Sequence, residues 1–485
     1  MTNPVRSVAV VGRDTAAWVM ALGLKRALAG IGVSVTIVEL PSALSPADVH
    51  AALPSLANLH GVLGLQEDAL FVRCGAVPSL GQQFTGWSAS PFVLGYDVSR
   101  PAINDVDFVQ FWSHARRQGM RVAFEDFSLA ATAAKHGRAG GGKPGKAGEA
   151  PQPGYHLNAQ AYAALLRQGC VAMGIDIRAS ATVTAEREGE RVSAVLLDDG
   201  SRVEADLFVD ASGGERVLIG SDGFDAWSDA FPATHLLTGA LPPLTPLPAH
   251  ARIVATAEGW AGLFPLQGMT AVTGHVAGEG AAARVLSAAG LAGVQGVMLR
   301  PFAAGMLQRS WAGNVVAVGE AAIAIERLDA AEIQLIQVAL SNLVALWPVD
   351  RADMPEARDF DRAMASHAGN IRDFQQAHYR LSDRPEPFWQ AARNAPISPD
   401  LASRLALFGA RGIVSHRDDE SFEPQSWAAM MIGHGVLPAE SDPAVDRTPP
   451  DEAIGKIQQL LHMIAEDVRA MPAVADVIAA KRAGR

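Results

Sequence analysis

The strongest constraint on the fold lies in residues 7 to 39, where two buried β-strands flank one helix. The run SVAVVG, residues 7 to 12, is rich in β-branched residues and ends in a glycine. A helical pattern rich in Ala and Leu follows from Thr15 to about Ala29, and VSVTIVE, residues 33 to 39, is a second strand that ends in an acid. This order of strand, glycine turn, helix, strand and acid predicts a βαβ unit that binds a dinucleotide.

The glycine turn of this unit is incomplete. The fingerprint needs one glycine for a tight turn, a second for the approach of a pyrophosphate, and a third for helix packing. Gly12 supplies the first, Asp14 stands in the place of the second, and Ala17 replaces the third. Asp14 brings a carboxylate to a helix N-terminus, where an anionic pyrophosphate would bind. Alternatively, Asp14 caps the helix with its own carboxylate, and on this position alone capping is the favoured interpretation.

Further nucleotide-binding landmarks follow in the expected order. Glu39 ends the second strand, where an acid can accept hydrogen bonds from ribose hydroxyls or can simply be an exposed strand end. The segments DASG, residues 210 to 213, and GEAA, residues 319 to 322, each follow a buried strand, at the end where ligands of α/β sheets bind. The second segment resembles the Gly-Asp-Ala-Ala box of FAD monooxygenases. The candidate FAD contacts are Gly12, Thr15, Ala16, Glu39, Asp210, Gly213, Gly319 and Glu320.

Composition limits the classes of partner. The chain has 485 residues, a formal net charge of −11 and no basic cluster, which argues against nucleic acid and anionic membranes. Its 2 cysteines, Cys74 and Cys170, are too few for a disulfide framework or a cysteine metal site, so we expect a reducing compartment and no metal. The N-terminus reads as a strand rather than a signal peptide, and we expect no membrane span and a cytoplasmic protein.

The predicted architecture is α/β. It combines an FAD-binding Rossmann-like domain of the glutathione-reductase type, an antiparallel β-sheet substrate region and a helical C-terminal part. The Rossmann-like domain is discontinuous, over residues 1–225 and 310–347, and carries a Gly/Pro-rich loop at 137–154 that we expect to be flexible and without secondary structure. The β-rich region covers residues 226–309, and the helical region covers residues 348–485.

Several motifs together resemble the flavin-dependent tryptophan halogenases. The segment IRDFQQAHYRLSDRPEPFW, residues 371 to 389, is similar to the helix and loop of that family that carry Ile-Arg-Asp-Phe, His-Tyr and Pro-Phe-Trp. Trp18 matches a Trp that follows the glycine turn in the family, and YHLN from Tyr155 resembles its Tyr-His-Phe-Asp helix start. The stretch SFEPQSWAAMMIGHGVLPAESDP, from Ser421, resembles its Ser-Trp to Gly-x-Gly-x-x-Pro stretch. The resemblance covers nearly the whole chain.

The resemblance implies a chemistry whose main residues are altered here. In the family, a separate reductase supplies reduced FAD, oxygen and halide yield hypohalous acid, and a Lys and a Glu direct it at an aromatic ring. The Lys position falls at Ser79, or alternatively at Pro78, in GAVPSLGQQFTGW. A neutral hydroxyl donates a weaker hydrogen bond than an ammonium group and forms no haloamine. The Glu position falls at Asp329, whose side chain is one methylene shorter. The implied catalytic residues are therefore Ser79 and Asp329.

Three further positions depart from the family pattern. The second Trp of its Trp-x-Trp-x-Ile-Pro motif is Gly262 here, which leaves more room near the flavin. Glu332 replaces a glycine whose amide helps to hold halide, and a carboxylate there would repel chloride. The flavin strap, a Gly-Glu-Ala-Thr-Ile-Pro-like run in the family, reads VHAALP at residues 49 to 54. We therefore expect that halide binding and lysine-assisted halogenation are lost.

Two functions remain open from the sequence. The first is an FAD-dependent monooxygenase of the halogenase family, which uses reduced flavin and oxygen on an aromatic, indole- or tryptophan-like substrate. The second is a non-catalytic relative that binds FAD weakly or not at all. The family often forms dimers, so a homodimer is a further expectation. Each candidate also has a structural interpretation, with Ser79 as a loop residue, Asp329 as a helix cap and the aromatic residues as core packing. Candidates for the substrate pocket are Phe92, Trp260, Phe264, Phe388, Trp389 and Trp427.

Overall fold

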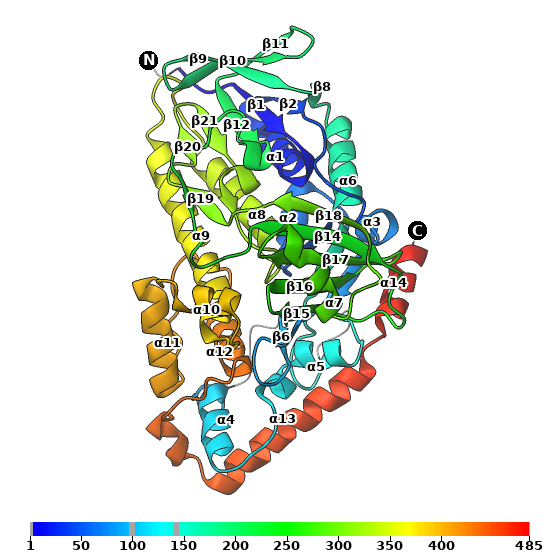
Figure 1. The fold of residues 1–485 in the computed structure, drawn as a ribbon, viewed down its shortest axis with the longest axis vertical. Coiled ribbons are helices and arrows are strands. Elements are labelled where there is room, and N and C mark those ends of the chain that lie inside the picture. The colour runs from blue at the N-terminus through cyan, green and yellow to red at the C-terminus, as the bar shows by residue number, and fades with distance from the viewer. Residues whose placement is uncertain (1–2, 97–101, 140–144, 485) are drawn as a thin grey trace. The chain divides into compact units, whose positions relative to one another are not determined.

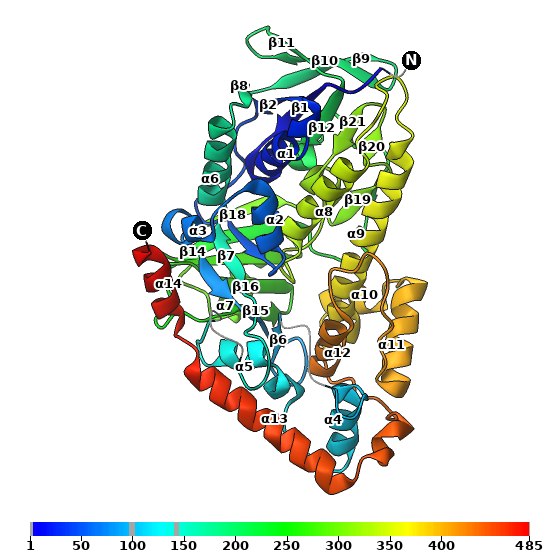
Figure 2. The same cartoon turned by 180° about the vertical axis from the view of Figure 1, so that it is seen from behind.

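The computed structural model describes residues 3–96, 102–139 and 145–484. The chain divides into two compact units, both drawn in Figures 1 and 2. Unit 1 comprises residues 1–75, 157–228 and 302–370, and unit 2 comprises residues 76–156, 229–301 and 371–485. Both units are discontinuous in sequence, and each is described by itself below.

Unit 1 holds the predicted βαβ unit. Its helices are α1 (Asp14–Ala27), η1 (Ala29–Ile31), α2 (Leu56–Leu63), α3 (Glu67–Arg73), α6 (Ala159–Ala172), η3 (Gly213–Glu215), η5 (Gly319–Ala321), α8 (Glu332–Ala345) and the first part of α9 (Glu356–Leu381). Its strands are β1 (Ser7–Gly12), β2 (Ser34–Glu39), β3 (Val49–Ala52), β8 (Asp176–Ala179), β9 (Val183–Glu188), β10 (Arg191–Leu197), β11 (Arg202–Glu204), β12 (Leu207–Ala211), β13 (Phe224–Ala226), β19 (Gly305–Leu307), β20 (Trp311–Ala312), β21 (Val315–Ala317) and β22 (Ile323–Ala324).

A mainly parallel sheet forms the centre of unit 1. Its strand order is β20-β21-β12-β1-β2-β8, and only β20 runs antiparallel to its neighbour. The central strands consist almost wholly of buried apolar residues, as expected for a parallel sheet covered on both faces. Figure 1 shows α1 beside β1 and β2, and α1 also contacts α6 and α8. The βαβ prediction is therefore confirmed.

The end of β1 requires a glycine. A Cβ atom on Gly12 would lie 2.3 Å from the carbonyl oxygen of Ala211 on β12, which no real Cβ contact tolerates. Gly12 is paired in register with Ala211 on one side and with Glu39 of β2 on the other. The glycine therefore permits the close approach of β1 and β12 that sets the register of the sheet.

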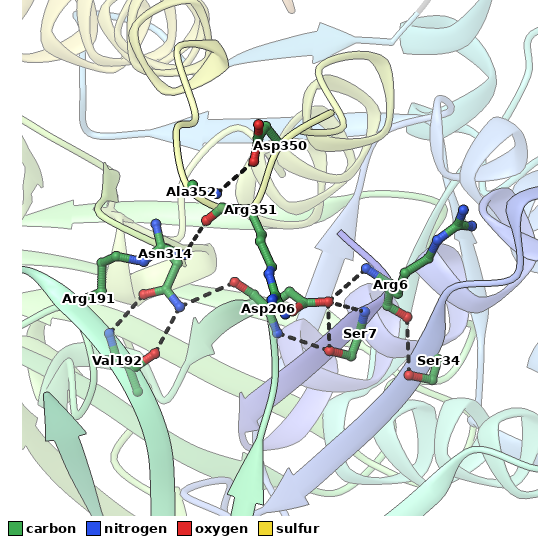
Figure 3. A network of polar contacts seen from close by, with 10 residues as sticks. All are labelled: Arg6, Ser7, Ser34, Arg191, Val192, Asp206, Asn314, Asp350, Arg351 and Ala352. Carbon is green, nitrogen blue, oxygen red and sulfur yellow. Dashed lines mark hydrogen bonds and ion pairs between the residues drawn. The ribbon is translucent and has the colours of Figure 1, made fainter. Parts of the chain in front are cut away.

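One carboxylate, that of Asp206, ties the start of β1 to the loop before β12 (Figure 3). It accepts hydrogen bonds from the backbone amides of Arg6 and Ser7 at 2.8 and 3.0 Å and from the Ser7 hydroxyl at 3.1 Å. The Arg351 guanidinium lies 3.3 Å from it. Burial opposes ionisation of Asp206, but these hydrogen bonds outweigh it and lower the pKa of the carboxyl below its usual value.

Asn314 extends the same network to β10 (Figure 3). Its amide oxygen accepts a hydrogen bond from the backbone amide of Val192 at 2.8 Å, and its amide nitrogen donates to the Val192 and Asp206 carbonyls at 2.9 and 3.2 Å. The hairpin of β10 and β11, with Gly200 at a φ of +81° in its turn, is thereby joined to the central sheet.

Unit 2 contains the β-rich region and the C-terminal helices. Its strands are β4 (Val77–Ser79), β5 (Gly81–Thr85), β6 (Phe92–Gly95), most of β7 (Gly154–Asn158), β14 (His235–Leu241), β15 (Ala251–Thr256), β16 (Gly259–Pro265), β17 (Thr270–Val276) and β18 (Gln295–Pro301). Its helices are α4 (Phe108–Arg117), η2 (Phe124–Phe127), α5 (Leu129–Lys135), η4 (Glu279–Ala281), α7 (Ala282–Ala288), the last part of α9, α10 (Pro387–Asn394), α11 (Pro399–Arg411), α12 (Pro424–Gly433), η6 (Pro443–Arg447), α13 (Pro450–Ala470) and α14 (Val474–Ala483).

The main sheet of unit 2 has the order β18-β14-β17-β16-β15-β5-β6 and is antiparallel except where β15 meets β5. Val272, Val276 and Leu263 of this sheet pack against Val285 and Leu286 of α7. In Figure 2, α13 runs beside α5, with which it is in contact. The predicted antiparallel sheet and helical C-terminal part are confirmed. No helix within the described ranges is long and apolar enough to cross a membrane.

The boundaries of the units differ from those expected. Residues 76–156, predicted to belong to the Rossmann-like domain, lie in unit 2 because β5 pairs in parallel with β15. The C-terminal helices after residue 371 also belong to unit 2 rather than forming a separate region. In the predicted Gly/Pro-rich loop 137–154, residues 140–144 lie outside the described residues, and residues 145–153 contain neither helix nor strand. The prediction fails at two positions, because Arg138 forms a β-bridge with Ala473 and Gly154 begins β7. Asp467 of α13 accepts hydrogen bonds from the amides of Lys146 and Ala147 there.

The close approach at Gly12 makes a strong stability prediction. Gly12→Ala forces a Cβ atom against the Ala211 carbonyl, and we expect a loss of at least about 2–3 kcal/mol in the free energy of unfolding. Gly214→Ala is the matched control, because a Cβ there meets nothing within 4 Å, and its cost stays below about 1 kcal/mol. Urea denaturation checks both. Equal midpoints for the two variants would contradict the assigned strand contact.

The lowered pKa of Asp206 predicts a pH-dependent contribution to stability. A carboxyl whose pKa is depressed by folding stabilises the protein above its unfolded pKa of about 3.9, and this contribution disappears as the pH falls through the folded value. Asp206→Asn should therefore lower the melting temperature at pH 7, by an amount equivalent to about 1–2 kcal/mol. The gap to the wild type should narrow below about pH 4. A gap that does not change with pH would rule out this role, and Asp222→Asn, at an exposed acid, serves as control.

Candidate functional site

The predicted cofactor contacts gather at one edge of the unit 1 sheet. Gly12, Glu39 and Ala211 stand in register at the carboxyl ends of β1, β2 and β12, and Asp210 stands opposite Ala317 of β21. Gly319 begins η5 two residues after β21 ends. This is the edge at which ligands of doubly wound sheets bind, next to the first helix N-terminus.

The turn between β1 and α1 keeps the conformation of the glycine fingerprint. Asp14 has a φ of +57°, in the left-handed region that a glycine adopts without strain. Its carboxylate does not cap α1, so the capping interpretation is wrong: the N-cap is Arg13, with no side-chain cap. The carboxylate instead accepts hydrogen bonds from the Ser42 hydroxyl at 2.5 Å and the Ala43 amide at 3.0 Å. The loop after β2 therefore holds the Asp14 charge.

The first turn of α1 is tightly enclosed. Thr15 is buried, and its Oγ1 lies 2.8 Å from Nε2 of His50 on β3. A Cβ atom on Gly319, which has a φ of +59°, would lie 3.1 Å from the Cβ of Ala16. The structure therefore brings Thr15, Ala16 and Gly319 together where the sequence placed the cofactor.

Glu39 is not simply an exposed strand end, and its contact with ribose stays a prediction. Its carboxylate accepts bidentate hydrogen bonds from the guanidinium of Arg167 on α6, with an Nη2–Oε2 distance of 2.9 Å. The hydrogen bonds that Arg167 donates to Glu39 raise the pKa of Arg167, whose guanidinium also lies 5.5 Å from the ring centroid of Trp18. Glu39 is thus part of an ion pair that ties α6 to the end of β2, and a contact with ribose would add to this pair.

Asp210 holds the loop that follows β12. The carboxylate is fully buried and accepts hydrogen bonds from the backbone amides of Ser212, Leu218 and Ile219 at 3.0, 2.7 and 2.9 Å. It also accepts one from the Ser212 hydroxyl at 2.6 Å. These four hydrogen bonds show that Asp210 shapes the loop, and its direct contact with FAD stays a prediction. Gly213, with a φ of +77°, forms the turn of that loop.

Two arginines join the three loops at this edge. Arg13, after β1, forms a bidentate pair with Glu215 of η3, with both N–O distances at 2.8 Å. Arg216 donates a hydrogen bond to the Ala321 carbonyl of η5 at 3.0 Å and lies 3.9 Å from the ring centroid of Phe224. Burial lowers the pKa of Arg216. The loops after β1, β12 and β21 are therefore held as one rigid platform.

A chain of polar contacts runs from Glu320 back to α1. Arg327 lies 3.3 Å from Glu320 and 3.1 Å from Glu332 at the start of α8. Burial lowers the pKa of Arg327, but Glu332 and Glu320 outweigh this effect and raise it. Glu332 in turn lies 3.2 Å from Nδ1 of His50. Arg327 therefore balances the negative charge of Glu332. The sequence alone led to the expectation that this carboxylate repels chloride, because it does not show the ion pair.

Asp329 lies in a strained segment before α8. It is buried and has a φ of +60°, and Ala330 follows with a φ of +59°. Successive left-handed residues that are not glycine cost free energy and tend to occur at functional sites. The N-cap of α8 is Ala331, with no side-chain cap, so the alternative interpretation of Asp329 as the helix cap is wrong.

Ser79 lies in unit 2 at the end of β4. It is fully buried, and its hydroxyl donates a hydrogen bond to the Gly81 carbonyl at 3.2 Å. Its strand pairs with β7, where Ser79 stands opposite Gly154 and Val77 stands opposite His156. Burial lowers the pKa of His156 to about 3, so this imidazole is neutral.

The predicted aromatic pocket residues are all buried in unit 2. Trp260 and Phe264 lie on β16, where Trp260 packs on His275 and Phe264 meets His156 edge-on. Phe92 stacks on Phe84 with a centroid distance of 5.1 Å. Trp389 stacks on Tyr379 and donates a hydrogen bond from Nε1 to the Thr256 carbonyl at 2.6 Å.

Trp87 joins Phe92 and Trp389 into one cluster. Its ring lies 5.7 Å from Phe84, the stacking partner of Phe92, and 4.9 Å from Trp389. Phe388 and Trp427 also pack within unit 2, with the Arg404 guanidinium 4.1 Å from the Trp427 ring centroid. A role of these residues in substrate binding stays a prediction.

Sequence reasoning missed Arg327, Arg167 and the role of His50. Arg327 has a local signal, because it stands among Glu320, Glu326 and Glu332 and an arginine among acids is a candidate ion-pair partner. Arg167 and His50 have none, since their partners lie 128 and 282 positions away in the chain.

Comparison with known proteins gives a consistent result. A family model described as tryptophan halogenase matches residues 7–450. The chain is 26% identical over 448 residues to tryptophan 7-halogenase KtzQ of Kutzneria sp. (strain 744), over 84% of this chain and 82% of that protein. The structure matches BrvH, a flavin-dependent halogenase from Brevundimonas sp. BAL3, with a TM-score of 0.90 and 28% identity over 98% of this chain and 99% of that one.

A second solved structure agrees. Xcc4156, a flavin-dependent halogenase from Xanthomonas campestris, matches with a TM-score of 0.91 and 26% identity, over 99% of each chain. With nearly the whole chain matched both in sequence and in fold, this protein belongs to the tryptophan halogenase family.

Proposed function

We propose that the chain is an FAD-dependent monooxygenase of the halogenase family that acts on an aromatic, indole- or tryptophan-like substrate. Reduced FAD would come from a separate flavin reductase, with molecular oxygen as co-substrate. The observation that carries this proposal is the carboxyl edge of the unit 1 sheet, where Gly12, Thr15, Ala16 and Gly319 converge at an uncapped helix N-terminus.

The residues at this edge fit an FAD pyrophosphate. No described side chain caps α1, so the amides of its first turn are available to an anion. Asp14 keeps the left-handed turn of a glycine, and Ser42 and Ala43 draw its carboxylate toward their own loop. Cβ atoms on Gly213 and Gly214 would meet nothing within 4 Å, so open space adjoins these two residues of the loop after β12.

In this proposal some side chains bind the cofactor and others take part in the reaction. Bound reduced flavin would supply electrons for the activation of oxygen. The first turn of α1 would orient the pyrophosphate, and Glu320, which is partly exposed and paired with Arg327, would contact the ribityl chain. In this proposal Asp329 acts as the base beside the substrate, and Ser79 donates a neutral hydrogen bond where the family has an ammonium group.

Loss of the Asp14 charge should strengthen FAD binding. Like charges about 4 Å apart repel by about 1 kcal/mol in water, so Asp14→Asn should lower the Kd for FAD about fivefold or more. Asparagine keeps an oxygen that can accept the bond from Ser42. Quenching of tryptophan fluorescence during FAD titration measures the effect. Asp222→Asn removes the same charge at an exposed position of unit 1 and should leave the Kd unchanged. A weaker Kd for Asp14→Asn would show that the carboxylate supports the bound state.

Ser79 provides a test of the catalytic alignment. Ser79→Lys restores the cationic group of the family, and we expect bromide-dependent halogenation of indole, with a flavin reductase, to rise at least about tenfold. Ser79→Met has a side chain of similar length without the charge and should give no increase. Mass spectrometry of the products provides the measurement. If lysine and methionine behave alike while both variants bind FAD, Ser79 does not occupy the catalytic position.

A further inference from the structure

One buried histidine links the predicted cofactor-binding turn to the charged residues of α8. His50 on β3 lies with Nε2 at 2.8 Å from Thr15 Oγ1 and with Nδ1 at 3.2 Å from Glu332 Oε2. The same Glu332 oxygen lies 3.1 Å from Arg327 Nη1. The side chain of His50 is 3% exposed, so these contacts form away from solvent.

The direction of each hydrogen bond follows from the donor inventory. An ionised Glu332 beside Arg327 only accepts, so Nδ1 of His50 carries a proton and donates to it. In the neutral imidazole, Nε2 then holds a lone pair, and the Thr15 hydroxyl donates to it. In the imidazolium form, Nε2 donates to Thr15 Oγ1 after rotation of the hydroxyl hydrogen.

Both protonation states of His50 therefore keep two hydrogen bonds. A buried histidine is usually satisfied in only one state, and a proton added to it then breaks a contact. Here Glu332 Oε2 and Thr15 Oγ1 can both accept, so His50 can gain or lose a proton without loss of a hydrogen bond. This arrangement is suited to a residue that takes up a proton when its surroundings become more negative.

The charges around His50 indicate which event favours uptake of a proton. With neutral His50, Arg327 faces both Glu332 and Glu320 and also lies near Asp48, so carboxylates outnumber the guanidinium in this group. Asp14, adjacent to Thr15, adds another carboxylate to the same turn. An anionic pyrophosphate at the first turn of α1 would add still more negative charge, and protonation of His50 offsets it.

We propose that His50 is a positioning residue that holds Thr15 at the start of α1 and takes up a proton when FAD binds there. This inference rests on the proposed function, because it requires the cofactor pyrophosphate at the first turn of α1. FAD affinity should then rise as the pH falls, because binding is coupled to the uptake of a proton.

The other groups around His50 are identified. Glu332 favours its protonation and Arg327 opposes it, and Tyr162 of α6 meets its ring edge-on with a centroid distance of 6.3 Å. His60 contacts Tyr162, with its Nε2 at 2.9 Å from the Tyr162 hydroxyl. The buried Asp48 directly precedes β3 in the chain. Burial lowers the pKa of His60 to about 4, so His60 stays neutral across the pH range tested below.

The test measures the Kd for FAD between pH 5.5 and 8.5 on the full-length protein by fluorescence quenching. We expect the Kd to fall by up to about tenfold per pH unit on acidification, the limit for uptake of one proton. Calorimetric titration in two buffers with different ionisation enthalpies should report uptake of up to about one proton per FAD. Neither measurement uses catalytic activity.

Matched variants separate proton uptake from a purely structural role. His50→Gln keeps hydrogen-bonding groups but cannot bind a proton, so its Kd should be independent of pH and close to the wild-type value at high pH. His60→Gln makes the same change at the other buried histidine near Tyr162 and should keep the wild-type slope. Thr15→Ser retains the acceptor for Nε2–H and should also keep the slope, whereas Thr15→Val should reduce it.

The outcomes distinguish this inference from the proposed function. If the wild type binds FAD with the same Kd at all pH values and without proton uptake, the role of His50 is disproved and the cofactor assignment stands. A slope that persists in His50→Gln also disproves it. If the wild type binds no FAD at any pH, the proposed function fails, and the inference fails with it.

Discussion

The structure of unit 1 depends on the close, in-register pairing of β1 with β12 at Gly12. No side chain fits there, because a Cβ atom would lie 2.3 Å from the Ala211 carbonyl. This pairing fixes the ends of the central strands at one edge, and the Arg13–Glu215 pair and the hydrogen bond from Arg216 to Ala321 lock the loops that follow. Backbone packing therefore positions the helix N-terminus that would bind a pyrophosphate. Because this packing does not depend on the loop side chains, those side chains can change without moving the helix.

The charged residues that depart from the expected family pattern have hydrogen-bond or ion-pair partners in this chain. Asp14 stands where the fingerprint has a glycine, but its backbone keeps the left-handed conformation. Its carboxylate accepts hydrogen bonds from Ser42 and Ala43. Glu332 and His50 lie at two further positions where the sequence departs from the pattern expected of the family. They contact each other, and Arg327 balances the charge of Glu332. The single change Glu332→Gly would therefore remove a partner of both His50 and Arg327, so it should be combined with changes at these two residues.

The sequence predicted local elements well and long-range partners poorly. The βαβ unit and the C-terminal helices follow from periodicity and turn residues, which act over a few positions. The assignment of residues 76–156 to the Rossmann-like domain differs from the structure, because the parallel pairing of β5 with β15 joins segments about 170 positions apart. For the same reason, the partners of Asp14, Glu39 and His50 could not be read from the sequence, whereas the buried ends of β1, β12 and β21 could.

The most direct test of the account is a crystal structure of the protein soaked with FAD. The account predicts density for the pyrophosphate against the amides of the first turn of α1, beside Thr15 and Ala16, with the Asp14 carboxylate still bound to Ser42 and Ala43. A structure in which protein side chains cover these amides, with the flavin absent or bound elsewhere, would contradict it.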